Sequence, residues 1–168
     1  MWSTVRGAAQ GVVRTWAGNK GTILSAPIER AIEWGIALAE DTSDTSLSTV
    51  RRFMAGDAQQ RRRLLDRNVI VHAAGGLPYS GEYRGPQGFF ELLTRMREVL
   101  VLAPGPISHH ALTANTVAAC FRLTFTARAS GASVEMGLVE LYTVRDGLIV
   151  ELDVYYKDPS AVAALLIR

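Results

Sequence analysis

The chain has 168 residues, of which 48% are hydrophobic and 20% charged, and its formal net charge is +2. These values are typical of one folded domain and exclude a disordered chain, while so small a charge argues against a protein that coats nucleic acid. No stretch approaches the roughly 18 uninterrupted apolar residues of a membrane span. Cys120 is the only cysteine, which excludes an intramolecular disulfide and favours a reducing compartment.

The N-terminal region carries Arg6, Arg14 and Lys20 before its first acidic residue, Glu29. An Arg-bearing, acid-poor start is typical of an organelle transit peptide, and it also arises by chance in chains rich in Ala and Arg. We therefore expect a cytoplasmic protein, with organelle targeting as the alternative.

Residues 1–44 are predicted to be an N-terminal extension with an accessory helix over 27–40, and residues 45–168 the main domain. Within the main domain, apolar residues recur at helical spacing in three segments. These segments are 47–54, 58–65 and 85–100.

Strands dominate the rest of the main domain. A short β-branched strand is predicted over 68–73, and a meander of longer strands follows the third helix, separated by residue types typical of tight turns. The predicted meander strands are 106–113, 116–128, 132–144 and 148–156, and a short helix begins near Pro159. Helices followed by a long curved sheet predict an α+β fold in which helices cover one face.

Motif searches exclude several site types. Gly76 and Gly81 have the glycine spacing of a phosphate loop, but Glu82 and Tyr83 stand where Lys and Ser/Thr are required, so we expect no nucleotide or other cofactor. His109 and His110 are adjacent, so on a strand they leave opposite faces and cannot share a metal ion.

The arginine run 61–63 is interpreted as a solvated helical face, because no second basic cluster or interleaved aromatic residue accompanies it. No nucleic-acid partner is therefore expected.

Three strings resemble the SnoaL-like branch of the nuclear transport factor 2-like superfamily, which includes ketosteroid isomerases and polyketide cyclases. They are "GDAQQRRRLL", "VIVHAAGGLPYSGEYRG" and "VELYTVRDGLIVELDVYYKD", and the similarity spans roughly residues 45–166. The resemblance implies a cone-shaped curved antiparallel sheet wrapped by three helices and open at one end into an apolar pocket. It also implies a homodimer formed through the outer face of the sheet.

The resemblance places His72 where ketosteroid isomerases have their general-base carboxylate. Histidine suits proton abstraction because its unperturbed pKa lies near 6.5. The alternative is a histidine that only hydrogen-bonds a carbonyl at the pocket rim, which the glycine-rich segment after it resembles.

Glu140 resembles the second isomerase carboxyl, which is held protonated near an oxyanion. Its neighbours on the same face of the predicted strand include Tyr142, and the apolar setting is expected to raise its pKa. Glu140 either serves a site or pairs with a buried group, for which Arg122 is the candidate.

Other positions depart from the isomerases. The first helix of the main domain, "LSTVRRFMAG", lacks their oxyanion-hole tyrosine, and Val154 replaces the last-strand acid of polyketide cyclases unless the register slips to Asp153. Strict alternation puts Val150, Leu152, Val154 and Tyr156 on a pocket face, and Glu151, Asp153 and Tyr155 on a dimer or solvent face. The remaining substrate-contact candidates are Tyr79, Tyr83 and Phe90.

Two functions are therefore carried forward. The first is a cofactor-free isomerase, cyclase or dehydratase that transfers protons on a hydrophobic, carbonyl-bearing molecule such as a polyketide or terpenoid. In it, His72 would abstract a proton, and Glu140 with Arg122 or Tyr142 would stabilise the enolate. The second is a module of the same fold that binds a small molecule or dimerises without catalysis.

Overall fold

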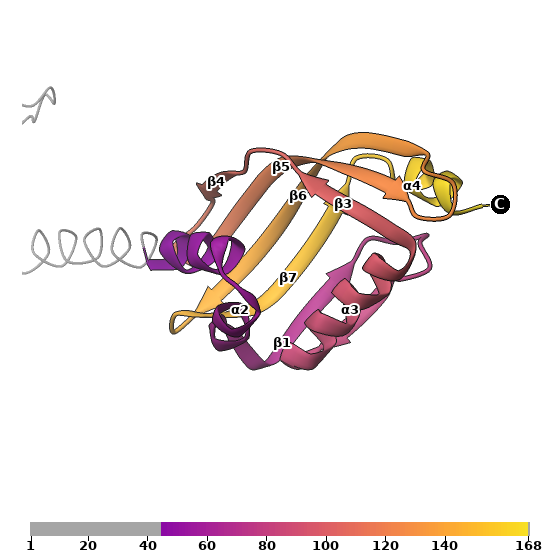
Figure 1. The fold of residues 1–168 in the computed structure, drawn as a ribbon. Coiled ribbons are helices and arrows are strands. Elements are labelled where there is room, and N and C mark those ends of the chain that lie inside the picture. The colour runs from indigo at the N-terminus through magenta and orange to yellow at the C-terminus, as the bar shows by residue number, and fades with distance from the viewer. Residues whose placement is uncertain (1–44, 168) are drawn as a thin grey trace, which may run out of the picture. The chain divides into compact units, whose positions relative to one another are not determined.

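The computed structural model describes residues 45–167 (Figure 1). The predicted accessory helix, the proposed targeting segment and the whole extension 1–44 lie outside the described residues. Residues 45–55 are helical and are followed by the other elements in chain order. These are α2 (Ala58–Leu64), β1 (Leu65–Ala73), β2 (Gly81–Arg84), α3 (Gly85–Val99), β3 (Leu100–Pro104), β4 (Ser108–Ala111), β5 (Thr116–Ala127), β6 (Ser133–Arg145), β7 (Leu148–Tyr156) and α4 (Pro159–Leu166).

One curved sheet contains all the strands, in the order β2-β1-β7-β6-β5-β3, and β4 pairs with the other end of β5. The long strands β5, β6 and β7 form the predicted antiparallel meander, which the register Glu140↔Val154 illustrates. Strand β1 runs parallel to β7, with His72 opposite Asp153. The fold is therefore the predicted α+β cone with one parallel pair in its sheet.

Helix α3 packs along β1 and the hairpin strand β2 (Figure 1). Its start is marked by Gly85, whose φ of 69° favours glycine, followed by Pro86 in the first turn. A Cβ atom on Gly88 would lie 3.0 Å from the backbone carbon of Tyr83, so the close approach of helix and strand requires glycine there.

The structure adds two short strands that the sequence pattern did not predict. Residues 81–84 lie in the glycine-rich segment and pair with β1 to form β2, and Leu100, predicted as the end of a helix, begins β3. Both are sheet-edge strands whose backbone pairs with a longer neighbour, so tertiary pairing outweighs their weak local preference.

The apolar core fills the space between the inner face of the sheet and the helices. Its fully buried members include Phe125, Leu100, Ile149 and Val69. Among the helices of the described residues, none is long and apolar enough to cross a membrane.

Candidate functional site

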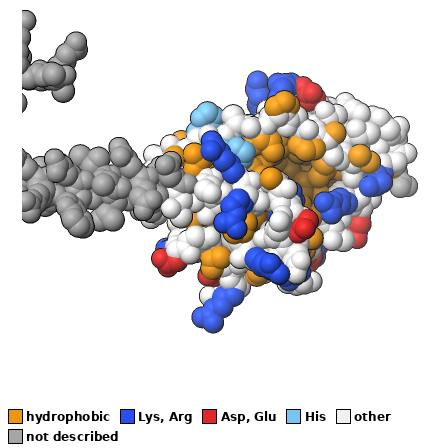
Figure 2. All heavy atoms as spheres, turned by 60° about the vertical axis from the view of Figure 1, so that its left-hand side comes forward, with side chains coloured by type: hydrophobic (Ala, Val, Ile, Leu, Met, Phe, Trp, Pro, Cys, Tyr) orange, Lys and Arg blue, Asp and Glu red, His pale blue; other side chains and the backbone are white. Residues whose placement is uncertain are grey.

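The inner face of the sheet and helix α3 enclose a pocket of about 450 Å³, a size typical of small-molecule sites. Its wall is mostly apolar and includes Leu92, Met96, Leu123, Leu138 and Leu152. Figure 2 shows a hydrophobic hollow in this part of the surface, with Lys and Arg side chains near its edge. The pocket is therefore apolar, as the resemblance implied.

Glu140 lines this pocket from β6. Strand alternation sends its side chain inward with Leu138 and Tyr142, whereas Val139 and Leu141 point to the outer face. Glu140 is half-buried as a residue, because it faces the pocket. Protein atoms nevertheless surround its carboxylate group. Burial raises the pKa of Glu140, while the hydrogen bond from Tyr142 and the charge of Arg61 oppose that rise.

Tyr142 contacts Glu140 directly, because its hydroxyl donates to Glu140 Oε2 over 2.5 Å. The Tyr142 ring is only 1% exposed and packs edge-on against Phe53, with ring centroids 5.8 Å apart. Burial raises the pKa of Tyr142 well above its usual value, and the neighbouring carboxylate adds to that rise. Tyr142 therefore stays protonated and holds the carboxyl group in one orientation.

Two further tyrosines, Tyr79 and Tyr156, line the pocket. Burial raises the pKa of each, and Glu140 and Tyr79 add to the rise at Tyr156. The two hydroxyls are close enough to influence each other, yet no well-aligned hydrogen bond joins them. Tyr79 Oη is buried and has no hydrogen-bond partner among the described residues. Both hydroxyls remain protonated, and the effect of Glu140 on the pKa of Tyr156 shows that this hydroxyl lies within electrostatic range of the carboxyl group.

Arg61 is a lining residue that the sequence interpretation assigned to a solvated face. Its Nε and Nη2 atoms donate to the carbonyls of Phe53, at 3.2 Å, and Met54, at 2.9 Å, where the first helix ends. Arg61 precedes the buried Leu64 by three residues, so helical spacing already pointed to its inward face.

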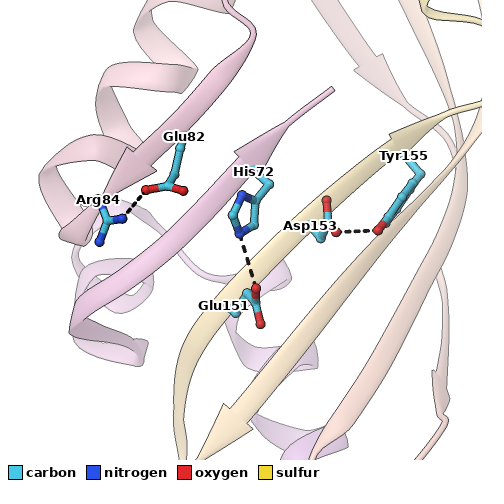
Figure 3. Close-up of polar contacts among 6 residues, drawn as sticks. All are labelled: His72, Glu82, Arg84, Glu151, Asp153 and Tyr155. Atoms are coloured by element: carbon cyan, nitrogen blue, oxygen red, sulfur yellow. Dashed lines mark hydrogen bonds and ion pairs between the residues drawn. The ribbon is translucent and has the colours of Figure 1, made fainter. Parts of the chain in front are cut away.

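The structure places His72 outside the pocket, on the outer face of the sheet (Figure 3). Its Nε2 atom lies 3.3 Å from Glu151 Oε1, and the side chain is 37% exposed. The expectation that His72 points inward is not met, because the neighbouring residues Val71 and Ala73 occupy the inner face of β1. The sequence did not indicate this direction, because Ile70, on the same face as His72, is as apolar as Val69 and Val71.

The same outer face carries the polar side chains of β2 and β7. Figure 3 shows Glu82 paired with Arg84 at 2.5 Å, and the Tyr155 hydroxyl donating to Asp153. From Glu151 onward β7 alternates as predicted, because Leu152, Val154 and Tyr156 line the pocket while Glu151, Asp153 and Tyr155 do not. Val150, predicted on the pocket face, does not line the pocket, because the register of β6 with β7 shifts there and Ile149 is buried in its place. Val154, and not Asp153, is therefore the inward last-strand residue.

Three other predicted contacts lie away from the pocket. Arg122 is not the partner of Glu140, because it lies on the opposite face of β5 and pairs with the exposed Glu135. The Tyr83 hydroxyl donates to the Tyr79 carbonyl at 2.8 Å, which supports the pocket wall from behind. Phe90 packs on a neighbouring ring and under the guanidinium of Arg62.

His109 and His110 point to opposite faces of β4, as predicted. Their Cα partners are Ala119 and Ala118. His110 Nε2 lies 3.1 Å from Ser108 Oγ, and His109 Nε2 has no hydrogen-bond partner in the part of the chain that the structure describes. Within residues 45–167, no group of three or more His, Cys, Asp or Glu side chains is placed to hold a metal ion.

Several solved structures have the same fold. A nuclear transport factor 2-like protein of Burkholderia xenovorans LB400 is 20% identical, with a TM-score of 0.67 over 74% of this chain and 97% of that one. A candidate polyketide cyclase of Xanthomonas campestris pv. campestris is 18% identical, with a TM-score of 0.62 over 74% and 98%. TerC, co-crystallised with polyporic acid, is 19% identical, with a TM-score of 0.60 over 73% and 98%.

Identities this low establish the shared fold alone. No curated protein matches the sequence. The SnoaL-like domain model matches residues 48–152, which contain β1 to β6, most of β7 and most of the pocket wall. The chain therefore belongs to the SnoaL-like family.

Proposed function

We propose that this protein binds a hydrophobic, carbonyl-bearing small molecule and transfers a proton on it, with Glu140 as the acid/base group. The observation that carries the proposal is the position of Glu140, which is the only acid lining the pocket within the described residues. A carboxylate whose pKa is raised by an apolar wall is a stronger base than an exposed one, so it can accept a proton and return it.

The hydroxyl groups of Tyr79 and Tyr156 suggest where the carbonyl oxygen of the substrate would bind. In its ionised form Glu140 would take a proton from the carbon next to the substrate carbonyl, and the electron pair would move onto the carbonyl oxygen. The hydroxyl of Tyr79, which has no protein partner among the described residues, and that of Tyr156 would donate hydrogen bonds to this oxygen. Glu140 would then return the proton to a different carbon, which completes an isomerisation without a cofactor.

The same geometry favours a second candidate, a binding module without catalysis. The pocket residues of the described part offer no second acid or histidine to divide the proton transfers with Glu140. A carrier would use the same tyrosine hydroxyls only to orient a ligand oxygen.

A single experiment separates these candidates. The protein is incubated with 1-tetralone in heavy water, and exchange of the hydrogens next to the carbonyl is followed by NMR. We expect acceleration by the wild-type protein and a loss of about a hundredfold or more in Glu140→Gln, since general acid/base groups contribute about 10²–10⁴-fold. Glu135→Gln, an exposed change on the same strand, is the matched control.

The outcomes are distinct. Full exchange in Glu140→Gln would refute the role of this residue, whereas binding without exchange in the wild-type protein would support the carrier. His72→Ala is expected to retain exchange because its side chain lies on the outer face. Loss of exchange in a folded His72→Ala variant would instead favour the base predicted from the resemblance.

We also propose that the outer face of the sheet forms a homodimer. Tyr155 is 50% exposed there, beside a row of groups that can pair across an interface. Sedimentation of the wild-type protein and of Tyr155→Arg tests this, because a bulky charge at the interface is expected to shift a dimer toward monomer.

A further inference from the structure

The mouth of the pocket carries positive charge that no acid balances. Four lining residues are exposed and therefore mark the mouth, and two of them are Arg97 and Arg128. The other two, Val101 and Pro104, are apolar. Neither arginine forms an ion pair within residues 45–167.

The side chain of Arg128 is bound to the backbone of Arg97. Arg128 Nε donates to the carbonyl oxygen of Arg97 over 2.5 Å, and the backbone N–H of Arg128 donates to the carbonyl of Val99 over 3.0 Å. These contacts tie the start of the β5–β6 turn to the end of α3. They use one guanidinium donor of Arg128 and none of Arg97, so the terminal nitrogens of both remain available at the mouth.

The lining residues behind the mouth are buried or half-buried, and most of them are apolar. Glu140 and the tyrosine hydroxyls occupy the enclosed part, and apolar side chains lie between them and the mouth. The other lining arginine, Arg61, is committed to two backbone carbonyls at the end of the first helix. Because neither Arg97 nor Arg128 is paired with a carboxylate among the described residues, the positive charge of the mouth favours an anion there.

We infer that the ligand of this pocket is an amphipathic organic oxyanion, whose apolar body fills the pocket and whose carboxylate or phosphate group lies between Arg97 and Arg128. The inference rests on the proposed function, because it assumes that the apolar part of the same ligand reaches Glu140. Guanidinium groups bind both kinds of oxyanion with paired, charge-assisted hydrogen bonds.

The test uses three naphthalene compounds of similar size: 2-naphthoate, 2-naphthyl phosphate and the neutral 2-naphthalenemethanol. Their affinities are measured by isothermal titration calorimetry at low salt. We expect at least one anion to bind about tenfold more tightly than the alcohol, and this preference to shrink in the variant R97Q/R128Q and at high salt. Affinity for the alcohol should change little in the variant.

The variant R67Q/R145Q removes the same charge at two exposed positions away from the pocket, and it should keep the preference. Comparison of naphthoate with naphthyl phosphate shows which oxyanion the mouth selects. Equal affinity for all three compounds, or a preference that survives in R97Q/R128Q, would overturn the inference and leave the pocket proposal intact. Failure of all three to bind would count against both proposals.

Discussion

The hydrogen bond between Tyr142 and Glu140 supports a prediction about stability and pH. Tyr142→Phe keeps the buried ring and its contact with Phe53 but removes the 2.5 Å hydrogen bond to the carboxyl group. A hydrogen bond to a charged group contributes about 1.5–3 kcal/mol, and one between neutral groups about 0.5–1.5 kcal/mol. The cost of the substitution should therefore depend on whether Glu140 is ionised.

The pKa of Glu140 determines whether the free energy of unfolding rises or falls with pH. Burial raises this pKa above 4.5, so the folded state holds the proton more tightly, and stability from this group is lost as pH rises from 4.5 through the folded pKa. The Tyr142 bond lowers the same pKa, so its removal enlarges that loss. We expect Tyr142→Phe to cost about 1 kcal/mol at about pH 4 and about 2 kcal/mol once Glu140 is ionised.

Urea denaturation of the wild-type protein and the variant, repeated from about pH 4 to about pH 8, measures this difference. Tyr83→Phe is the matched control, because it removes a buried tyrosine hydroxyl that donates to a neutral carbonyl at 2.8 Å. Its cost should be the same at every pH. If the two substitutions showed parallel pH dependence, the assignment of Glu140 as an ionisable group coupled to Tyr142 would be refuted.

Two further substitutions test the pocket residue Arg61 and the core residue Phe125. Arg61→Gln removes a positive charge that lowers the pKa of Glu140, so the pH profile of tetralone exchange should move to higher pH. Arg62→Gln is the control, and an equal profile in the two variants would contradict this prediction. Phe125→Ala empties a fully buried position and should lower the free energy of unfolding by about 3–5 kcal/mol in urea denaturation. Leu112→Ala, at a site 57% exposed, should change it by less than about 0.5 kcal/mol, and a similar value for Phe125→Ala would contradict the role of Phe125 in the core.

Local periodicity accounts for the parts of the site that were predicted correctly. Along β7, alternation alone separated the pocket residues Val154 and Tyr156 from the outward Asp153. Along β6 it placed Glu140 and Tyr142 on one inward face. These assignments depend only on the two-residue repeat of a strand, because the register shift between β6 and β7, at Thr143 and Val144, lies outside both runs of residues.

Other parts of the site depend on contacts between distant segments. The partner of Glu140 is Tyr142 and not Arg122, because the pairing of β5 with β6 puts Arg122 beside Glu135 on the other face. Arg128 reaches the pocket mouth only because its backbone and side chain bond the end of α3. No sequence pattern joins residues separated by this much chain.

The sequence by itself determined the family, the order of the long elements and the inward acid, because each follows from local spacing or from strings that are contiguous in the chain. The tertiary structure determined that His72 lies on the outer face of the sheet and that Arg61 bonds carbonyls at the end of the first helix. It also determined that Arg97 and Arg128 both line the mouth of the pocket. These features arise from packing of α2 and α3 against the sheet and from the parallel pairing of β1 with β7. Long-range pairing selects which side chains converge, and local preference does not encode that choice.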